Sequence, residues 1–387
     1  MSLKSVNSKR SKKRYRKEKL FKIYGVLALI FSFSFLIWFF SDMILKGKSG
    51  LRQAKVYVEV SITPEVLENP SLAFDDDILY YISRDDIRRL PLKIQDSQGL
   101  MNTTYKSWLV ADSDVDQYLK GNPNRLKNRD KIHIDKLKEE GKVKLSLNWG
   151  FFTNGDSNLP EIAGIKSAAF GTIYVMIITI LVSVPIGIAT AIYLEEYAKD
   201  NFLTRAVEVN INNLAAIPSI IYGLLGLAIF INFLHVPRSS ALAGGLTLGI
   251  MNLPVIVISA RAAIKSVPPS IKEAAYGVGA SKLQVIWHHT IPLALPGILT
   301  GFIIGLARSI GETAPLLIIG MVAYIPEPPS SFSSPTTVLP AQIYNWSTSS
   351  LRSFTERTSL AILVLLAVML ILNALAIWLR NRYENEW

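Results

Sequence analysis

The chain has 387 residues, of which 50% are hydrophobic, a formal net charge of +11 and no cysteine. The lack of cysteine excludes disulfides, thiolate metal sites and cysteine nucleophiles. Residues 1–22 hold ten Lys/Arg against Glu18 alone, and an apolar run of membrane length follows at once. Basic clusters beside a first membrane span stay in the cytoplasm. We therefore interpret the charge as a topological signal, not as a nucleic-acid-binding tail.

The apolar residues are gathered in blocks of about twenty, and a helix of that length crosses a hydrocarbon core of ~30 Å. The sequence predicts an all-α polytopic membrane protein with six transmembrane helices. The expected spans are about 22–45, 166–193, 207–234, 241–264, 292–324 and 358–379. The first run is too long for a signal peptide, so we expect an uncleaved anchor. An even number of spans places both chain ends in the cytoplasm.

Residues between the first and second spans are polar and nearly neutral, which is typical of a folded domain. The alternation over 55–62 predicts a strand, and 81–91 and 114–140 suggest short helices. Topology places this small α/β domain outside the cytoplasm. The expected division is a basic cytoplasmic tail 1–21, a transmembrane helix 22–45, an extracytoplasmic domain 46–160, a second transmembrane domain 161–379 and a cytoplasmic tail 380–387.

The segment 266–292, between spans four and five, has the signals of a helix–turn–helix. They are one capping box of Ser270 with Glu273, the left-handed turn residue Gly279, and a second capping box of Ser281 with Gln284. Pro292 and Pro296 are expected to close the segment. Ala274 and Ala275 present little bulk, which suits close contact with another chain. Arg261, just before this segment, is expected to snorkel to the membrane surface.

This segment carries a family resemblance. Glu273, Ala274, Ala275, Gly279 and Pro292 are spaced as in the coupling loop of ABC-importer permeases. Two neighbouring positions depart from that pattern, which has Ile where this chain has His289 and Leu where it has Ile291. The resemblance implies that the segment seats in a cleft of a separate ATPase subunit.

The chain has no G-x-x-x-x-G-K-[ST] sequence, so ATP is expected to be used by that ATPase subunit. We predict that this chain is not an enzyme and binds no cofactor. His288 and His289 lie without other ligands near them in sequence, so no metal site is expected.

The predicted fifth span carries two charges, Arg308 and Glu312, four residues apart and hence on one helix face. A charge at this depth costs about 2.5–3.5 kcal/mol on insertion scales, so it usually faces a partner or a polar path. Two interpretations compete. The pair holds the bundle together, or Arg308 contacts an anionic substrate and Glu312 balances it. Asn213 and Ser219 at the start of span three either line the same path or belong to a helix start with a proline kink.

Residues 210–226, 311–317 and 338–346 resemble the A-type permease subunit of the bacterial high-affinity phosphate transporter. The resemblance covers about 146–387, and 46–145 more weakly resembles an extra domain carried by a subset of those subunits. It implies import of inorganic phosphate, with Arg308, Glu312 and Thr313 in the translocation motif. It also implies two ATPase subunits, a C-type permease and a periplasmic phosphate-binding protein as partners, in the lipid of the bacterial inner membrane.

Two alternatives stay open. The permease can carry another oxyanion such as sulfate or molybdate, which the local motifs disfavour. The chain can also be a membrane scaffold for phosphate-responsive signalling. An intact Arg308–Glu312 pair favours transport over a scaffold, because a scaffold does not need it.

Overall fold

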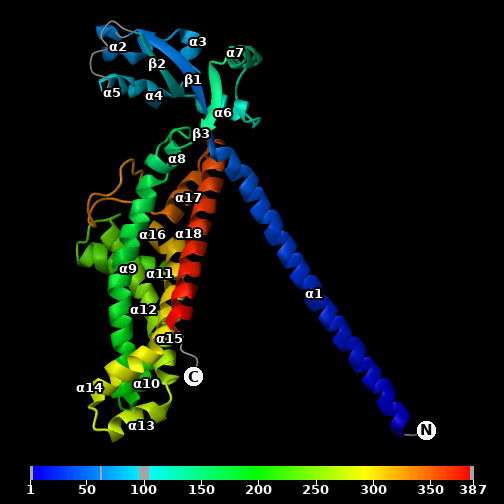
Figure 1. Ribbon diagram of the computed structural model, residues 1–387, viewed down its shortest axis with the longest axis vertical. Helices are drawn as coiled ribbons and strands as arrows, with labels where there is room; N and C mark the ends of the chain where they lie inside the picture. Colours follow the sequence, from blue (N-terminus) through cyan, green and yellow to red (C-terminus); the bar gives the residue numbers. More distant parts are fainter. Residues whose placement is uncertain (1–2, 62, 96–103, 384–387) are drawn as a thin grey trace.

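The computed structural model describes residues 3–61, 63–95 and 104–383. Figure 1 shows a bundle of long helices with a small α/β domain at one end and a group of short helices at the other. Long helix α1 leaves the bundle near the small domain and extends away from it. The N-terminal end of α1 and the short helices therefore lie at the same end of the molecule.

Five helices in the described part of the chain are long and apolar enough to cross a membrane. They are α1 (Leu3–Gly50), α9 (Lys166–Ile192) with its extension η2 (Tyr193–Tyr197), α12 (Ala241–Lys265), α15 (Ile291–Gly311) with the turns before it, and α18 (Phe354–Tyr383). Four of the six predicted spans are thus found at the predicted places. The third and fifth differ from the prediction.

The third predicted span, 207–234, is not one straight helix. Helix α10 (Phe202–Ala215) and helix α11 (Ser219–Gly226), which continues as η3 (Leu227–Phe233), meet at a bend of 104°. Pro218 lies at the bend, where it offers no N–H and disfavours a helical conformation in the residue before it. The Tyr222 hydroxyl donates to the Leu214 carbonyl at 2.8 Å and ties the two arms together. If this pair is one broken span, the described part of the chain has six candidate crossings, α1 included.

The fifth predicted span, 292–324, begins earlier and ends earlier. One helical run comprises α14 (Lys282–Val285), the π turn η4 (Ile286–Thr290) and α15, and it ends at Gly311. Pro292 therefore does not close the segment, since it lies inside this run. Glu312 is extended, and the short helix α16 (Ala314–Ile318) follows. Pro315 explains the early end, because it lacks the N–H that would bond the Gly311 carbonyl.

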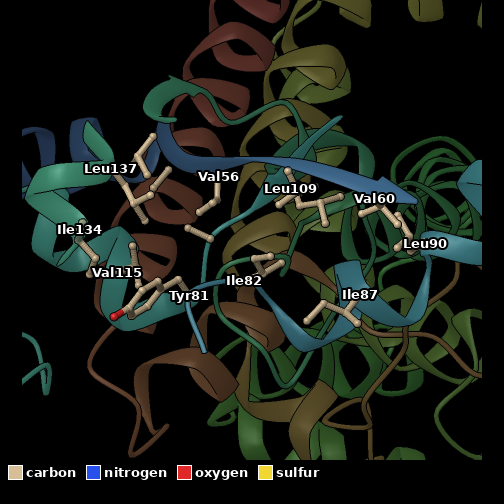
Figure 2. Close-up of a cluster of buried hydrophobic side chains, with 14 of the residues drawn as sticks. Val56, Val60, Tyr81, Ile82, Ile87, Leu90, Leu109, Val115, Ile134 and Leu137 are labelled. Carbon is tan, nitrogen blue, oxygen red and sulfur yellow. The ribbon is translucent and has the colours of Figure 1, made fainter. Parts of the chain in front are cut away.

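The small domain is built on a three-stranded antiparallel sheet in the order β2-β1-β3. Its strands are β1 (Arg52–Ser61), β2 (Thr104–Val110) and β3 (Val143–Leu147), and its helices are α2 (Pro64–Glu68), η1 (Pro70–Ala73), α3 (Asp76–Leu79), α4 (Arg84–Arg88), α5 (Leu90–Gln95), α6 (Ser113–Leu119) and α7 (Asn128–Glu139). Alternate side chains of β1, among them Val56 and Val60, point into one apolar core with Leu109 and Ile134 (Figure 2). The strand predicted at 55–62 is found as β1 up to Ser61, and residue 62 lies outside the described residues.

Short helices α8 (Gly150–Thr153) and α17 (Leu339–Ser347) join the small domain to the bundle. Phe151, Trp346 and Phe354 form one buried cluster there. Helix α1 meets α18 at the same place, where a Cβ added to Gly50 would lie 3.0 Å from the Glu356 carbonyl oxygen. Most of the apolar side chains of α1 from Tyr15 to Leu45 are exposed in the single chain.

A buried set of polar side chains, which we call the polar junction, fastens the small domain to the bundle. It comprises Gln53, Ser83, Asp116, Lys120, Glu161, Glu356 and Arg357. Lys120 Nζ lies 2.5 Å from an oxygen of Asp116 and 2.9 Å from an oxygen of Glu356, which starts α18. Every group here is nearly removed from water, so each charge depends on its partners for compensation.

Glu161 is the member of this junction with the least compensation. Its carboxylate accepts from the Ser83 hydroxyl at 2.8 Å, and burial raises its pKa to about 7. Between about pH 4.5 and pH 7 the unfolded chain has lost this proton and the folded chain keeps it. The resulting stabilisation is complete below about pH 4.5 and is lost as the pH rises through about 7. The difference in pKa corresponds to roughly 3 kcal/mol.

We therefore expect Glu161→Gln to flatten the fall in stability that the wild-type protein shows between pH 4.5 and pH 7. Thermal unfolding of the detergent-solubilised protein across this pH range measures the effect. Glu65→Gln, a change at an exposed carboxylate of the small domain, is the control and should keep the wild-type slope. A Glu161→Gln variant with an unaltered slope would assign the pH dependence to other groups.

Candidate functional site

The predicted charged pair is present near the end of α15. Arg308 Nε lies 3.2 Å from Glu312 Oε1, and the Arg308 side chain is 47% exposed in the single chain. Glu312 is more enclosed, with 18% of its side chain exposed. Of the three guanidinium nitrogens of Arg308, only Nε has a hydrogen-bond partner among the described residues. The terminal nitrogens are therefore free to donate to an anion on the open side of α15.

Ser309, the residue that follows Arg308, fixes the rotation of α15 about its own axis. Ser309 is buried, receives a hydrogen bond from the Asn252 side chain on α12, and donates to the Gly305 carbonyl at 3.1 Å. Gly301 allows close packing, since a Cβ there would lie 1.8 Å from the Ser259 hydroxyl oxygen of α12. Because successive helix residues point in different directions, a Ser309 that faces α12 leaves Arg308 on the open face.

The other three predicted pathway residues are Thr313, Ser219 and Asn213, and they are less closely associated with the Arg308–Glu312 pair. Thr313 lies between α15 and α16, and its hydroxyl donates to the Gly311 carbonyl at 3.4 Å. Ser219 begins α11, which packs on α16 so tightly that a Cβ on Gly223 would lie 2.7 Å from the Pro315 Cα. Asn213 is exposed on α10, before the bend. In the described ranges neither Asn213 nor Ser219 makes a hydrogen bond to the charged pair.

The coupling segment consists of α13 (Pro269–Gly277), α14 and η4. Gly279 has a φ of +87°, as the predicted left-handed turn requires. The second predicted capping box is present, with Ser281 N–H donating to the Gln284 side chain at 2.8 Å and the Ser281 hydroxyl accepting from the Gln284 N–H at 3.4 Å. The segment thus has the predicted two-helix form with an open, glycine-dependent turn between the helices.

The first predicted capping box is wrong. Helix α13 begins at Pro269, with Pro268 as its N-cap, so Ser270 lies inside the helix. The fixed φ of proline suits the first helical position, and this places the N-cap two residues earlier than the Ser270 signal. Glu273 therefore does not cap helix α13. It is exposed, and it has no ion pair with any residue that the structure describes.

The outer face of the coupling segment is apolar. Ala275 is buried, whereas Ala274 is exposed and Val278 is 87% exposed. A shallow hollow of about 420 Å³ opens beside them, lined by Ser270, Ile271, Ala274, Ala275, Val278 and His289. Exposed apolar surface of this kind is typical of a site that another protein covers.

Arg261, for which snorkelling to the membrane surface was predicted, has two carboxylate partners within the chain. It pairs with Glu195 in η2 and with Glu208 on α10, both at 2.7 Å. The acidic residues Glu195 and Glu196 directly follow the second predicted span, which ended at residue 193. They were the sequence signal from which a carboxylate partner for Arg261 could have been predicted, and the prediction did not use them.

A bundle of long apolar helices, a charged pair on one of them and an exposed apolar knuckle at one end together define the membrane component of a transport system. The chain belongs to the family described as binding-protein-dependent transport system inner membrane component, whose family model matches residues 183–385. Membership makes the chain a transporter subunit and not an enzyme. A second family model, described only as a domain of unknown function (DUF3333), matches residues 8–78.

Curated relatives agree with this family. The chain is 36% identical over 171 residues, 44% of this chain and 58% of the relative, to the probable ABC transporter permease protein YqgI of Bacillus subtilis. It is 34% identical over 163 residues to the phosphate transport system permease protein PstA 1 of Mycobacterium tuberculosis, covering 42% of this chain and 53% of the relative. For the phosphate transport system permease protein PstC of Pasteurella multocida the identity is 32% over 226 residues, covering 52% and 69%. The chain thus spans little more than half the length of the first two.

Proposed function

We propose that this chain is a permease subunit that passes inorganic phosphate into the cell, driven by a separate ATPase. The observation that carries the proposal is the open Arg308 beside Glu312 on α15. The two charges are only four residues apart, so their pairing ties no other helix of this chain to α15, and the Arg308 side chain is 47% exposed. The guanidinium fork matches the oxygens of a phosphate group, and Glu312 keeps the site from holding a dianion too tightly. Two of the relatives above are named phosphate transport permeases.

The orientation we propose places the small domain outside the cytoplasm. The basic start of α1 and the coupling segment lie at one end of the bundle, and the domain lies at the other (Figure 1). Basic residues beside a span favour the cytoplasmic side, and an ATPase works there. The inner membrane is then the location, with both chain ends in the cytoplasm. The partners are two ATPase subunits, a C-type permease and a periplasmic phosphate-binding protein.

Reconstitution tests the substrate. The chain, its C-type partner, the ATPase and the binding protein are placed in liposomes, and ATP-dependent uptake of radiolabelled phosphate is measured. We expect uptake that unlabelled phosphate competes away and that sulfate and molybdate do not. Uptake that sulfate or molybdate displaces more readily than phosphate would assign the permease to another oxyanion.

Docking of the ATPase is tested at the exposed Ala274. Ala274→Arg places a long charged side chain in the shallow apolar hollow, so we expect the ATPase to be lost when the permease is purified. Gly277→Ala is the control, because a Cβ at Gly277 meets nothing within 4 Å. Both variants should fold, since neither site is buried. Full retention of the ATPase by Ala274→Arg would place the contact elsewhere.

A further inference from the structure

Three consecutive residues at the end of α9 each hold a cation from a different part of the chain. Glu195 pairs with Arg261 of α12 at 2.7 Å, Glu196 pairs with Lys272 of α13 at 2.5 Å, and the Tyr197 ring lies below Lys282 of α14 at 4.7 Å. We call Glu195, Glu196 and Tyr197 the π-turn hub. Its three partners come from the last membrane helix before the coupling segment and from both helices of that segment.

The local backbone explains why three neighbours in sequence reach three separate elements. They lie in η2, whose wider hydrogen bonding closes with the Ala198 N–H donating to the Tyr193 carbonyl at 2.8 Å. Successive residues of a helical turn point in different directions, so the three side chains spread toward α12, α13 and α14. Single π turns occur frequently at functional positions in helices.

The contacts of the hub are partly shielded from water. The side chains of Glu196 and Lys272 are 8% and 22% exposed, and those of Glu195 and Arg261 are 17% and 22% exposed. The nearby pair of Asp200 with Arg205 is 76% and 69% exposed. Ion pairs strengthen as the surrounding dielectric falls, so the hub holds its partners more firmly than the exposed pair does.

The hub is connected to the charged pair through packed helices. Helix α9 fits closely on α12, where a Cβ on Gly245 would lie 2.5 Å from the Ile178 Cβ. Helix α12 in turn holds α15 through Asn252 and Ser309, next to Arg308. A displacement of α13 therefore has a continuous route through ion pairs and tight contacts to the open face of α15.

We propose that the π-turn hub transmits movement of the coupling segment to α9 and α12, and that Glu195 and Glu196 are positioning residues for transport. This inference rests on the proposed function, because it assumes that the coupling segment receives movement from the ATPase. Beyond the proposed function, the inference names the π-turn hub as the element through which that movement enters the bundle. Without the hub, the coupling segment stays attached by its chain ends but moves without carrying α9 along.

The first experiment measures phosphate imported per ATP hydrolysed in the reconstituted complex. We expect Glu196→Gln to lower this ratio about tenfold, a size typical of coupling between sites, while the ATPase stays bound and active. Asp200→Asn, which removes the same charge from the exposed pair, should leave the ratio unchanged. The charge exchange Glu196→Lys with Lys272→Glu should restore most of it. An unchanged ratio in Glu196→Gln, or no recovery in the exchange, would overturn the proposal.

The second experiment does not depend on the substrate. Because the chain has no cysteine, Gly277→Cys gives a single spin-label position in the coupling segment, outside the residues that line the docking hollow and where an added Cβ meets nothing within 4 Å. Electron paramagnetic resonance should show a more mobile label in Glu196→Gln than in the wild type or Asp200→Asn. If the wild-type complex imports no phosphate but the label responds, the proposed substrate fails and the hub stands. If phosphate is imported and neither mobility nor ratio changes, the hub is wrong.

Discussion

Arg308→Gln should lower phosphate uptake by between about tenfold and 100-fold, because hydrogen bonds to a charged group each contribute about 1.5–3 kcal/mol. Glutamine keeps a polar side chain, but it is shorter than arginine and lacks the charge and the forked pair of terminal nitrogens. Glu312 then faces the path with its charge uncompensated, which repels an incoming phosphate. The measurement is initial uptake in the reconstituted complex, with ATPase retention checked by co-purification.

Two further variants give this experiment its controls. Arg308→Lys keeps the charge and loses the fork, so its uptake should fall between that of the wild type and that of Arg308→Gln. Arg205→Gln removes a charge from the exposed pair on α10 and should leave uptake unchanged. Wild-type uptake in Arg308→Gln, together with a lower unfolding temperature, would mean that the pair only holds the bundle.

The fold was largely predictable because apolar runs and strand alternation are local signals. The membrane spans near residues 22–45, 166–193, 241–264 and 358–379 and the strand β1 followed directly from them. The bend at Pro218 was left open only as a proline kink at the start of span three, and the helix end at Gly311 was missed, for one physical reason. Both are breaks that proline imposes within apolar sequence, and hydropathy does not register a missing N–H.

The candidate site was predictable where its parts are neighbours in sequence. Arg308 and Glu312 lie one helical turn apart, and the Ser281 capping box is equally local. The π-turn hub was missed because its ion pairs join positions 66 and 76 residues apart. Only the folded arrangement of α9, α12 and α13 brings those charges together, so spacing alone does not identify the partners.

The second large effect concerns Arg357, the most enclosed charge of the polar junction. Arg357 is 2% exposed and donates to the carbonyls of Pro160 at 2.9 Å, Gly50 at 3.2 Å and Glu161 at 3.2 Å. These acceptors belong to the end of α1 and to the loop before α9. Arg357 itself lies on α18, so its guanidinium joins α18, the end of α1 and the loop before α9. Its charge also compensates the neighbouring carboxylates, including that of Glu356.

We expect Arg357→Met to reduce the free energy of unfolding by about 3–5 kcal/mol, the usual cost of removing one partner from a buried charged set. Methionine fills the space of the aliphatic stem, so the loss comes from three unpaired carbonyls and uncompensated carboxylates, not from a cavity. Thermal unfolding in detergent measures it, and limited proteolysis near residue 51 shows whether the small domain detaches first. Arg352→Gln, at an exposed arginine just before α18, should change neither. Unchanged unfolding in Arg357→Met would mean that apolar packing of α8, α17 and α18 alone holds the domain in place.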